Sequence, residues 1–274
     1  METIEALEVL FDDERRNQLT GELARLYGAG LGFGQIALYA NFVESVDGVV
    51  AIKGVPSAGS MISGRNEADR FLMGLLRAFA DAVLIGAGTM RDTPGHMWTP
   101  GHVFPPLASE FAELRKRLGR KTEPRLVLLT ASGELDSGHP AIEHGALILT
   151  TKPGERKLAG RLPKACEVVA LTDGNHLDLT DAVAHLRKTN YKVVLSEGGP
   201  HVIAQLLDKG LLEEIFLTIS PVMAGRTPDS PRLALIEGIE FLPKAGRWAE
   251  LKSARRHGSH LFLRYAFSEA KSAR

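Results

Sequence analysis

Short apolar runs alternate with amphipathic segments along most of this 274-residue chain. Short apolar runs bounded by turn residues are typical of buried strands, and apolar residues at every third or fourth position are typical of helices. The predicted strands cover residues 36–43, 82–86, 125–130, 146–150, 166–171 and 191–195. The predicted helices cover residues 67–80, 107–119, 153–160, 180–188 and 201–212. This alternation predicts an α/β fold, a mostly parallel sheet with helices on both faces.

The two ends of the chain depart from this alternation. Residues 4–27 are amphipathic and predict a helical extension. Residues 250–267 predict a C-terminal antiparallel hairpin that turns at His257-Gly258-Ser259. We therefore predict an N-terminal helical arm over residues 1–35 and one α/β domain over residues 36–268.

Composition excludes several classes of protein. Hydrophobic residues make up 44% and charged residues 24%, as in a globular protein with a sizeable core. Lys plus Arg equals Asp plus Glu, 33 each, so bulk charge gives no attraction to nucleic acid or to an acidic membrane. No apolar run approaches the roughly 20 residues that cross a bilayer. The single cysteine, Cys166, cannot form an internal disulfide, which favours a cytoplasmic location.

The motifs of several familiar sites are missing from the sequence. There is no phosphate-binding G-x-x-x-x-G-K-[ST], no H-E-x-x-H and no cysteine pair, so we predict no metal site. No G-x-S-x-G nucleophile turn is present. The glycines of residues 28–34 have the wrong spacing for a dinucleotide fingerprint and precede a strand, so we interpret them as a connector.

The stretch VVLSEGGPH, residues 193–201, places an acid, two glycines and a proline between a strand and a helix. Gly198 and Gly199 allow a close approach to the backbone, and Pro200 suits the first turn of a helix. A helix N-terminus attracts anions such as a phosphate. Glu197 would repel a phosphate there, so we expect it to face a sugar hydroxyl or another donor. An ordinary tight turn is the alternative interpretation.

A second glycine turn, residues 86–89 (GAGT), also follows a buried strand. Thr89 supplies a hydroxyl, and Asp92 lies just beyond. Parallel sheets bind ligands at the carboxyl ends of their strands, so two glycine turns at such ends predict one shared site. Asp47 ends the first strand region, and Ser63 belongs to a stretch that either caps a helix or presents hydroxyls to a ligand.

Six stretches together resemble the riboflavin-biosynthesis pyrimidine reductase family, the C-terminal reductase domain of the bifunctional deaminase-reductase. They are ANFVESVDGVVA, MISGRNEADR, LLRAFADAVLIGAGTMRDTP, RLVLLTASGEL, VVLSEGGPHVIAQLL and LEEIFLTISPVMAG. The resemblance runs from about residue 36 to the closing hairpin and implies a dihydrofolate-reductase-like fold. It makes residues 36–268 a pyrimidine reductase domain.

The resemblance also implies the reaction and the residues that carry it. Hydride from NADPH would reduce the ribosyl group of a 5-amino-6-ribosylamino-pyrimidinedione 5′-phosphate to ribityl, in a homodimer. The sequence motivates a homodimer through the apolar strand EEIFLTI and the hairpin stretch FLRYAF, which we expect near a sheet edge where they could pair with a second copy. The cofactor contacts that it implies are Ala51, Ile62, Ser63, Gly86, Thr89, Asp92, Thr130, Gly198, Gly199, Pro200, His201, Val202 and Ile203. The substrate contacts that it implies are Asp47, Ser63, Arg77 and Glu197. Either Asp47 or Glu197 would move the proton, and the sequence leaves both open.

Two positions depart from the family pattern. Val49 stands where many members carry a lysine, and the loop from Asp92 to Trp98 lacks an arginine. Both cations would bind a substrate phosphate, so we expect weaker dependence on that group, unless Arg65, Arg91, His96 or His102 replaces them. A reductase of dihydrofolate or another pterin or pyrimidine is one alternative. A non-catalytic dinucleotide-binding protein is another, which the retained Asp47, Arg77 and Glu197 disfavour.

Overall fold

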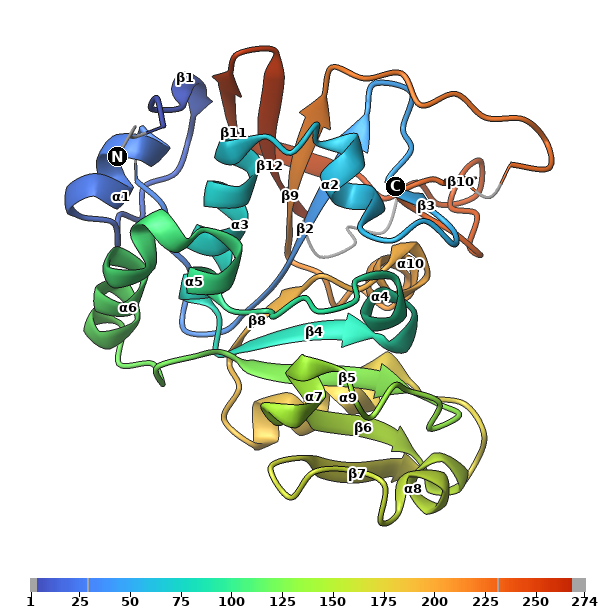
Figure 1. The fold of residues 1–274 in the computed structure, drawn as a ribbon. Coiled ribbons are helices and arrows are strands. Elements are labelled where there is room, and N and C mark those ends of the chain that lie inside the picture. Colours follow the sequence, from blue (N-terminus) through green and yellow to red (C-terminus); the bar gives the residue numbers. More distant parts are fainter. Residues whose placement is uncertain (1–3, 29, 231, 268–274) are drawn as a thin grey trace.

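A computed structural model describes residues 4–28, 30–230 and 232–267, with a ten-stranded sheet at its centre (Figure 1). The strand order is β1-β11-β12-β9-β2-β8-β4-β5-β6-β7. The strands are β1 (Glu8–Asp12), β2 (Ala37–Ser45), β4 (Ala82–Gly86), β5 (Arg125–Thr130), β6 (Leu147–Thr151), β7 (Glu167–Thr172), β8 (Val193–Ser196), β9 (Glu214–Ser220), β11 (Ala249–His257) and β12 (His260–Phe267). A separate antiparallel pair consists of β3 (Ala51–Ile52) and β10 (Arg232–Leu233). Residues 1–3 and 29 of the predicted arm, and 231 and 268 of the predicted domain, lie outside the described residues.

The strands from β9 to β7 run parallel to their neighbours, and β12, β11 and β1 add an antiparallel edge. Each predicted strand is present, and the C-terminal hairpin turns between His257 and His260. The predicted mostly parallel sheet with a terminal antiparallel hairpin is therefore confirmed. In the described parts of the chain, no helix combines the length and the apolar character needed to cross a membrane.

Helices cover both faces of the sheet. They are α1 (Gly21–Tyr27), α2 (Ala58–Ile62), α3 (Glu67–Phe79), α4 (Ala87–Asp92), α5 (Pro100–Val103), α6 (Ala108–Arg117), α7 (Pro140–Glu143), α8 (Lys152–Leu158), α9 (Leu179–Lys188) and α10 (Pro200–Asp208), with a 3₁₀ turn at Pro105–Leu107. One apolar core joins α1, α3 and α6 to the sheet, and a second core joins α9 and α10 to its other face. The sheet is thus the middle of three layers, which leaves its strand ends open to ligands.

Helix α3 shows how the sequence fixes one wall of the later site. The Asn66 side chain accepts a hydrogen bond from the Asp69 amide at 3.1 Å and caps the helix, as Ser, Thr, Asp and Asn commonly do. Phe71, Leu75 and Phe79 recur at helical spacing and are fully buried against the sheet. The helix therefore presents a fixed register of side chains to the space above the sheet.

The N-terminal segment differs from the predicted helix over residues 4–27. Residues 8–12 form β1, which pairs with β11 so that Glu8 lies opposite Arg256 and Asp12 opposite Ser253. Helix is confined here to α1. Without β1, the edge strand β11 would leave backbone N–H and C=O groups unpaired. Pairing with β11 therefore outweighs the weak helix propensity of residues 8–12.

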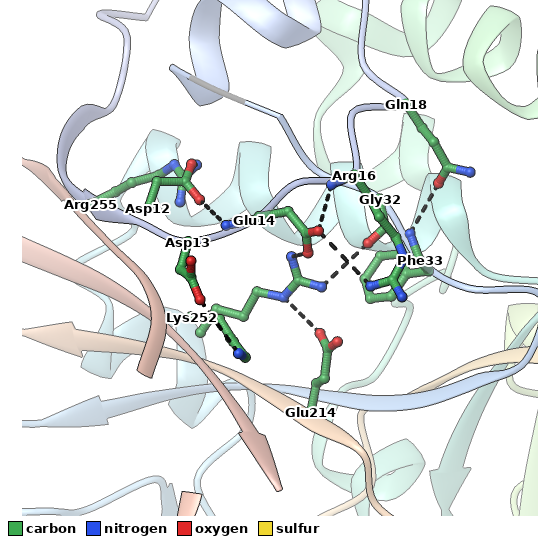
Figure 2. A network of polar contacts seen from close by, with 11 residues as sticks. Asp12, Asp13, Glu14, Arg16, Gln18, Gly32, Phe33, Glu214, Lys252 and Arg255 are labelled. Carbon is green, nitrogen blue, oxygen red and sulfur yellow. Dashed lines mark hydrogen bonds and ion pairs between the residues drawn. The ribbon is translucent and has the colours of Figure 1, made fainter. Parts of the chain in front are cut away.

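Ion pairs with little solvent exposure hold this N-terminal segment against the sheet (Figure 2). Arg264 donates to Glu14 at 2.5 Å and to Glu214 at 2.7 Å, and its side chain is 2% exposed. Arg255 donates to Asp12 at 2.6 Å, and its guanidinium lies 3.8 Å from the centre of the Tyr27 ring. Buried charges are stable only when paired, so these contacts fix the position of the segment before β2.

The sheet edge also differs from the sequence argument for a homodimer. Apolar strands near residues 214–220 and 260–267 were expected at an edge, where they could pair with a second copy of the chain. In the structure β9 lies between β2 and β12, and β1 covers the outer side of β11. That argument is therefore wrong, because the edge strand on this side is the short, polar-flanked β1.

Candidate active site

A cavity of about 790 Å³ opens where β4 and β8 end. Helices α2 and α3, the start of α10, the loop of residues 91–103 and the small β3–β10 pair form its walls. A second cavity of about 500 Å³, lined by residues 121–126 and His144 among others, contains none of the predicted site residues. The first cavity is therefore the candidate active site.

Most of the residues singled out from the sequence meet at this cavity. Those that line it are Ala51, Ser63, Arg77, Gly86, Thr89, Asp92, Glu197, Gly198, Gly199, Pro200, His201 and Val202. Four others do not: Asp47, Ile62, Thr130 and Ile203 are absent from its lining. Ile62 and Ile203 are buried, at 3% and 0% exposure, and Ile203 packs in the apolar core that contains α9 and α10.

The two glycine turns lie side by side because β4 and β8 are hydrogen-bonded parallel neighbours. A Cβ atom added at Gly199 would meet no atom of the chain closer than Thr89 Oγ1, at 3.7 Å. The φ of Gly199 is −67°, which any residue can adopt. Nothing in the chain itself thus requires glycine here, whereas a ligand that approaches the start of α10 would.

Glu197 and Arg77 form a bidentate ion pair in the wall of the cavity. Arg77 Nε donates to Glu197 Oε1 at 2.8 Å, and Nη2 donates to Oε2 at 2.6 Å. The Arg77 side chain is 1% exposed and that of Glu197 is 11% exposed. Arg77 is therefore covered and holds both oxygens of Glu197 in place, and the direct substrate contact expected of it from the sequence stays a prediction.

The remaining donors of Arg77 contact the loop of residues 96–99. Arg77 Nη1 donates to the carbonyl oxygens of Met97 and Thr99 at 3.2 and 3.4 Å, and Nη2 lies 2.9 Å from His96 Nε2. Arginine only donates, so His96 accepts through Nε2 and carries its proton on Nδ1. The loop, the helix and Glu197 are therefore held together by one guanidinium.

The histidines of this loop cannot replace a missing cation. Burial, together with the nearby Arg77 charge, lowers the pKa of His96 to about 2. Burial and the same arginine also lower the pKa of His102. Both shifts favour the neutral imidazole at neutral pH, which disfavours the alternative that these histidines bind a phosphate as cations.

Asp47 does not line the cavity and instead stabilises a turn. Its carboxylate accepts hydrogen bonds from Ser45 Oγ at 2.6 Å and from the amides of Ala224 and Gly225 at 2.9 and 2.7 Å. The Ser45 hydroxyl and these amides lower its pKa to about 2. A carboxylate with these partners is a poor proton acceptor, and it serves to fix the loop after β9.

Four exposed cations line the cavity: Lys53, Arg65, Arg70 and Arg91. Arg65 and Arg91 were expected from the sequence, whereas Lys53 and Arg70 were not. Val49 is fully buried, so it packs in the interior and faces no ligand. The cavity therefore carries positive charge at its rim, although both expected phosphate cations are missing.

Two further polar residues at the cavity were missed. Asp69 is 4% exposed and Asn41 is 9% exposed, and both line the cavity. The spacing of apolar residues could have identified both. Asp69 lies on the buried face of α3 with Leu72 and Leu76, and Asn41 follows Tyr39 on the inward face of β2. A polar residue at such an inward position needs a partner, and here it faces the cavity. Across the described residues, no group of three His, Cys, Asp or Glu side chains is placed to hold a metal ion.

Comparisons of the sequence with known proteins give two matches. The family model for the RibD C-terminal domain matches residues 37–257. A 2,5-diamino-6-ribosylamino-4(3H)-pyrimidinone 5′-phosphate reductase from Archaeoglobus fulgidus is 22% identical over 76% of this chain and 89% of its own length.

Solved structures share the fold. A pyrimidine reductase-like protein from Corynebacterium diphtheriae has a TM-score of 0.70 at 23% identity, over 90% of this chain and 98% of its own. RibD from Acinetobacter baumannii has a TM-score of 0.65 at 16% identity, over 85% of this chain and 59% of its own length. The family match, which covers most of the chain, identifies this protein as a member of the RibD C-terminal domain family.

Proposed function

We propose that this chain is an NADPH-dependent reductase that converts the ribosyl group of a ribosylamino-pyrimidine 5′-phosphate to ribityl. The observation that carries the proposal is the Glu197–Arg77 ion pair, placed in the cavity wall directly before the glycine turn of α10. A carboxylate held in place beside an open cavity of about 790 Å³ suits hydride transfer from a nicotinamide to a sugar carbon.

The residues present fit a dinucleotide. The glycine turns of β4 and β8 leave open space above Gly199. In the first turn of α10, Val202 and Ile203 donate to the Gly199 carbonyl oxygen, whereas the His201 amide has no partner within the helix. Gly86, Thr89 and Gly199 would hold the cofactor phosphates there, and the nicotinamide supplies the hydride when bound. The choice of NADPH over NADH comes from the family resemblance, and the rim cations would suit its extra phosphate.

Glu197 is the better of the two proton-handling candidates. It lines the cavity, and Arg77 fixes both of its oxygens, so its position relative to a bound sugar is set before the substrate arrives. Asp47 does not line the cavity, and both of its oxygens already accept hydrogen bonds within its turn. We therefore assign to Glu197 the movement of the proton at the ring oxygen or at the imine nitrogen.

The cations at the rim of the cavity support binding of a substrate phosphate. Lys53, Arg65, Arg70 and Arg91 are exposed beside the cavity and can form charge-assisted hydrogen bonds. Weaker dependence on this phosphate, expected from the departures in sequence, stays a prediction, and these cations oppose it.

An NADPH-oxidation assay tests the proposal. The phosphorylated riboflavin precursor, its dephosphorylated form and dihydrofolate would be compared as substrates under one set of conditions. Turnover of either precursor supports the proposal, and the ratio between them measures the dependence on phosphate. Preference for dihydrofolate, or tight NADPH binding without turnover of any of the three, would contradict it.

We also infer a homodimer that works in the cytoplasm. Leu242, Trp248 and Met223 are 69%, 83% and 69% exposed, and large exposed apolar side chains mark contact surfaces. Light scattering at micromolar concentration decides this, and a mass near that of one chain, 29.7 kDa, would contradict it. The lone cysteine supports a reducing compartment.

A further inference from the structure

His260 does not line the cavity, but it contacts the turn that joins α2 to α3, which contributes Ser63 and Arg65 to the cavity wall. This turn comprises residues 63–66, and His260 begins β12 at the tip of the C-terminal hairpin. The Nε2 atom of His260 lies 3.0 Å from the Ser63 carbonyl oxygen, and its Nδ1 lies 3.1 Å from Asn66 Nδ2. The last hairpin of the sheet therefore holds a turn of the cavity wall from behind.

The hydrogen bonds of this contact fit one arrangement of protons. A carbonyl oxygen only accepts, so Nε2 of His260 carries the ring proton and donates it to Ser63. Asn66 Oδ1 accepts from the Asp69 amide, so Asn66 Nδ2 is the atom that donates to Nδ1 of His260. The neutral imidazole thus joins the end of α2 to the cap of α3. A doubly protonated ring would set an N–H against the Asn66 amino group, and rotation of that amide would break the cap.

The surroundings of His260 favour the neutral ring. Burial lowers its pKa, the hydrogen bond to the Ser63 carbonyl raises it, and the charge of His257 lowers it. His257 lies opposite His260 across the hairpin turn. The turn of residues 63–66 presents two uncharged groups to the ring, the Ser63 carbonyl and the Asn66 amide. The contact is therefore complete at neutral pH and is lost when the ring becomes protonated in acid.

The turn has a strained backbone at Arg65, which explains why it needs support. The φ of Arg65 is +57°, in the left-handed region that residues with a side chain rarely adopt. Gly64, with a φ of +63°, ends α2 as left-handed glycines commonly end helices, but the same conformation at Arg65 costs energy and persists only where neighbouring contacts hold it. The strain places an exposed cation in the lining of the cavity.

We propose that His260 is a positioning residue, which fixes the turn of residues 63–66 so that Arg65 meets a phosphate group of the bound ligand. An arginine binds a phosphate through two parallel hydrogen bonds, and a guanidinium on a fixed turn loses less freedom on binding than one on a loose turn. The phosphate belongs either to the pyrimidine substrate or to the dinucleotide, so the inference rests on the proposed function for its ligand. His260 acts through the turn, since it does not reach the cavity itself.

The test measures affinity by calorimetry for two matched pairs of ligands, the riboflavin precursor with and without its 5′-phosphate, and NADPH with NADH. Wild type should bind the member with the extra phosphate at least about tenfold more tightly in one of the pairs, and that pair identifies which phosphate Arg65 binds. Arg65→Met and His260→Leu should each lower this preference about fivefold or more. The double variant should lower it no further than Arg65→Met alone, because His260 acts through Arg65.

Two more variants separate positioning from a general structural role. His257→Leu, which removes the other half-buried histidine of the same hairpin turn, is the matched control and should leave the preference unchanged. His260→Gln keeps a donor for the Ser63 carbonyl but cannot become charged, so it should retain part of the preference. The wild-type preference should fall to that of His260→Gln between about pH 8 and about pH 5, as the histidine ring takes up a proton. This comparison also serves should the leucine variant fail to fold.

The outcomes distinguish failure of the inference from failure of the proposed function. Equal losses for both members of each pair, additive losses in the double variant, or a wild type without preference in either pair would overturn the inference. A ratio of wild type to His260→Gln that stays constant with pH would overturn it as well. The expected preferences without any NADPH oxidation would remove the proposed function and keep the positioning role of His260.

Discussion

Arg77 and Glu197 lie 120 residues apart in the sequence and meet as a bidentate ion pair in the wall of the cavity, with N–O distances of 2.8 and 2.6 Å. One residue comes from α3 and the other from the end of β8, so the pair ties a covering helix to the strand whose end begins the glycine turn. Loss of either partner would leave an uncompensated charge in a covered site.

We predict that Arg77→Met destabilises the protein by about 3–5 kcal/mol and abolishes reductase activity, because breaking a covered pair strands the Glu197 charge. Urea denaturation and an NADPH-oxidation assay measure the two effects. The double variant Arg77→Met with Glu197→Gln should regain most of the stability and none of the activity. Equal stability of the single variant and wild type would show that the ion pair contributes nothing to the free energy of unfolding.

Replacement of Gly199 by valine should weaken NADPH binding at least tenfold, about 1.4 kcal/mol, with little change in the free energy of unfolding. The reason is that a Cβ atom there meets no atom of the chain within 3.7 Å and therefore occupies only ligand space. Fluorescence titration measures the affinity, and Gly174→Ala, a substitution outside the cavity lining at a glycine whose Cβ position is also open, is the control. Unchanged affinity in Gly199→Val would remove this turn from the cofactor site.

Asp69→Asn should stabilise the protein by about 3 kcal/mol at pH 8 and by almost nothing near pH 4. The pKa of Asp69 in the folded protein, about 6, lies above the ordinary value of 3.8, so the folded state holds this proton more tightly. The ionised group therefore subtracts stability as pH rises from about 4 to 6, and the full loss persists above pH 6. Thermal unfolding of both proteins across this range checks the sign, with Glu67→Gln as the control. A gain that shrinks as pH rises would refute the raised pKa.

Glu14→Ala should cost about 3 kcal/mol of stability, because it leaves Arg264, 2% exposed, with only one of its two carboxylate partners. Glu8→Ala is the matched comparison, since the Glu8–Arg256 pair also joins the N-terminal segment to the C-terminal hairpin but is half exposed and should contribute less than about 1 kcal/mol. Chemical denaturation of the two variants side by side measures the difference. Equal effects would mean that burial of the Arg264 network adds nothing.

The parallel sheet could be predicted because each of its strands is a short apolar run between turn residues, as in 82–86 and 191–195. The strand β1 could not, because its residues carry a pattern that suits a helix and its partner β11 lies at the other end of the chain. The spacing of apolar residues reflects local helix or strand preference. Whether a segment at the sheet edge becomes a strand depends instead on which backbone groups of the neighbouring strand remain unpaired.

In the candidate site, too, features set by local sequence could be predicted, and features set by distant contacts could not. Gly199 and Glu197 could be located because a glycine turn after a buried strand always emerges at one edge of a parallel sheet. The role of Arg77 as a support for Glu197 depends on a contact across 120 residues that no local pattern contains. The position of Asp47 outside the cavity lining could not be predicted either, since an Asp-Gly turn looks the same in sequence whether its carboxylate faces a ligand or neighbouring amides.

The pairing of β1 with β11 also sets an order for folding. Asp12 and Arg255, which join the two strands, are 243 residues apart, so the ribosome makes the N-terminal strand long before its partner exists. During synthesis, residues 8–12 therefore lack their hydrogen-bond partners on β11. When β1 and β11 finally pair, they close a loop that contains nearly the whole domain. The sheet can be finished only after the hairpin of β11 and β12 has been made, which makes completion of its outer edge a late event in the life of each new chain.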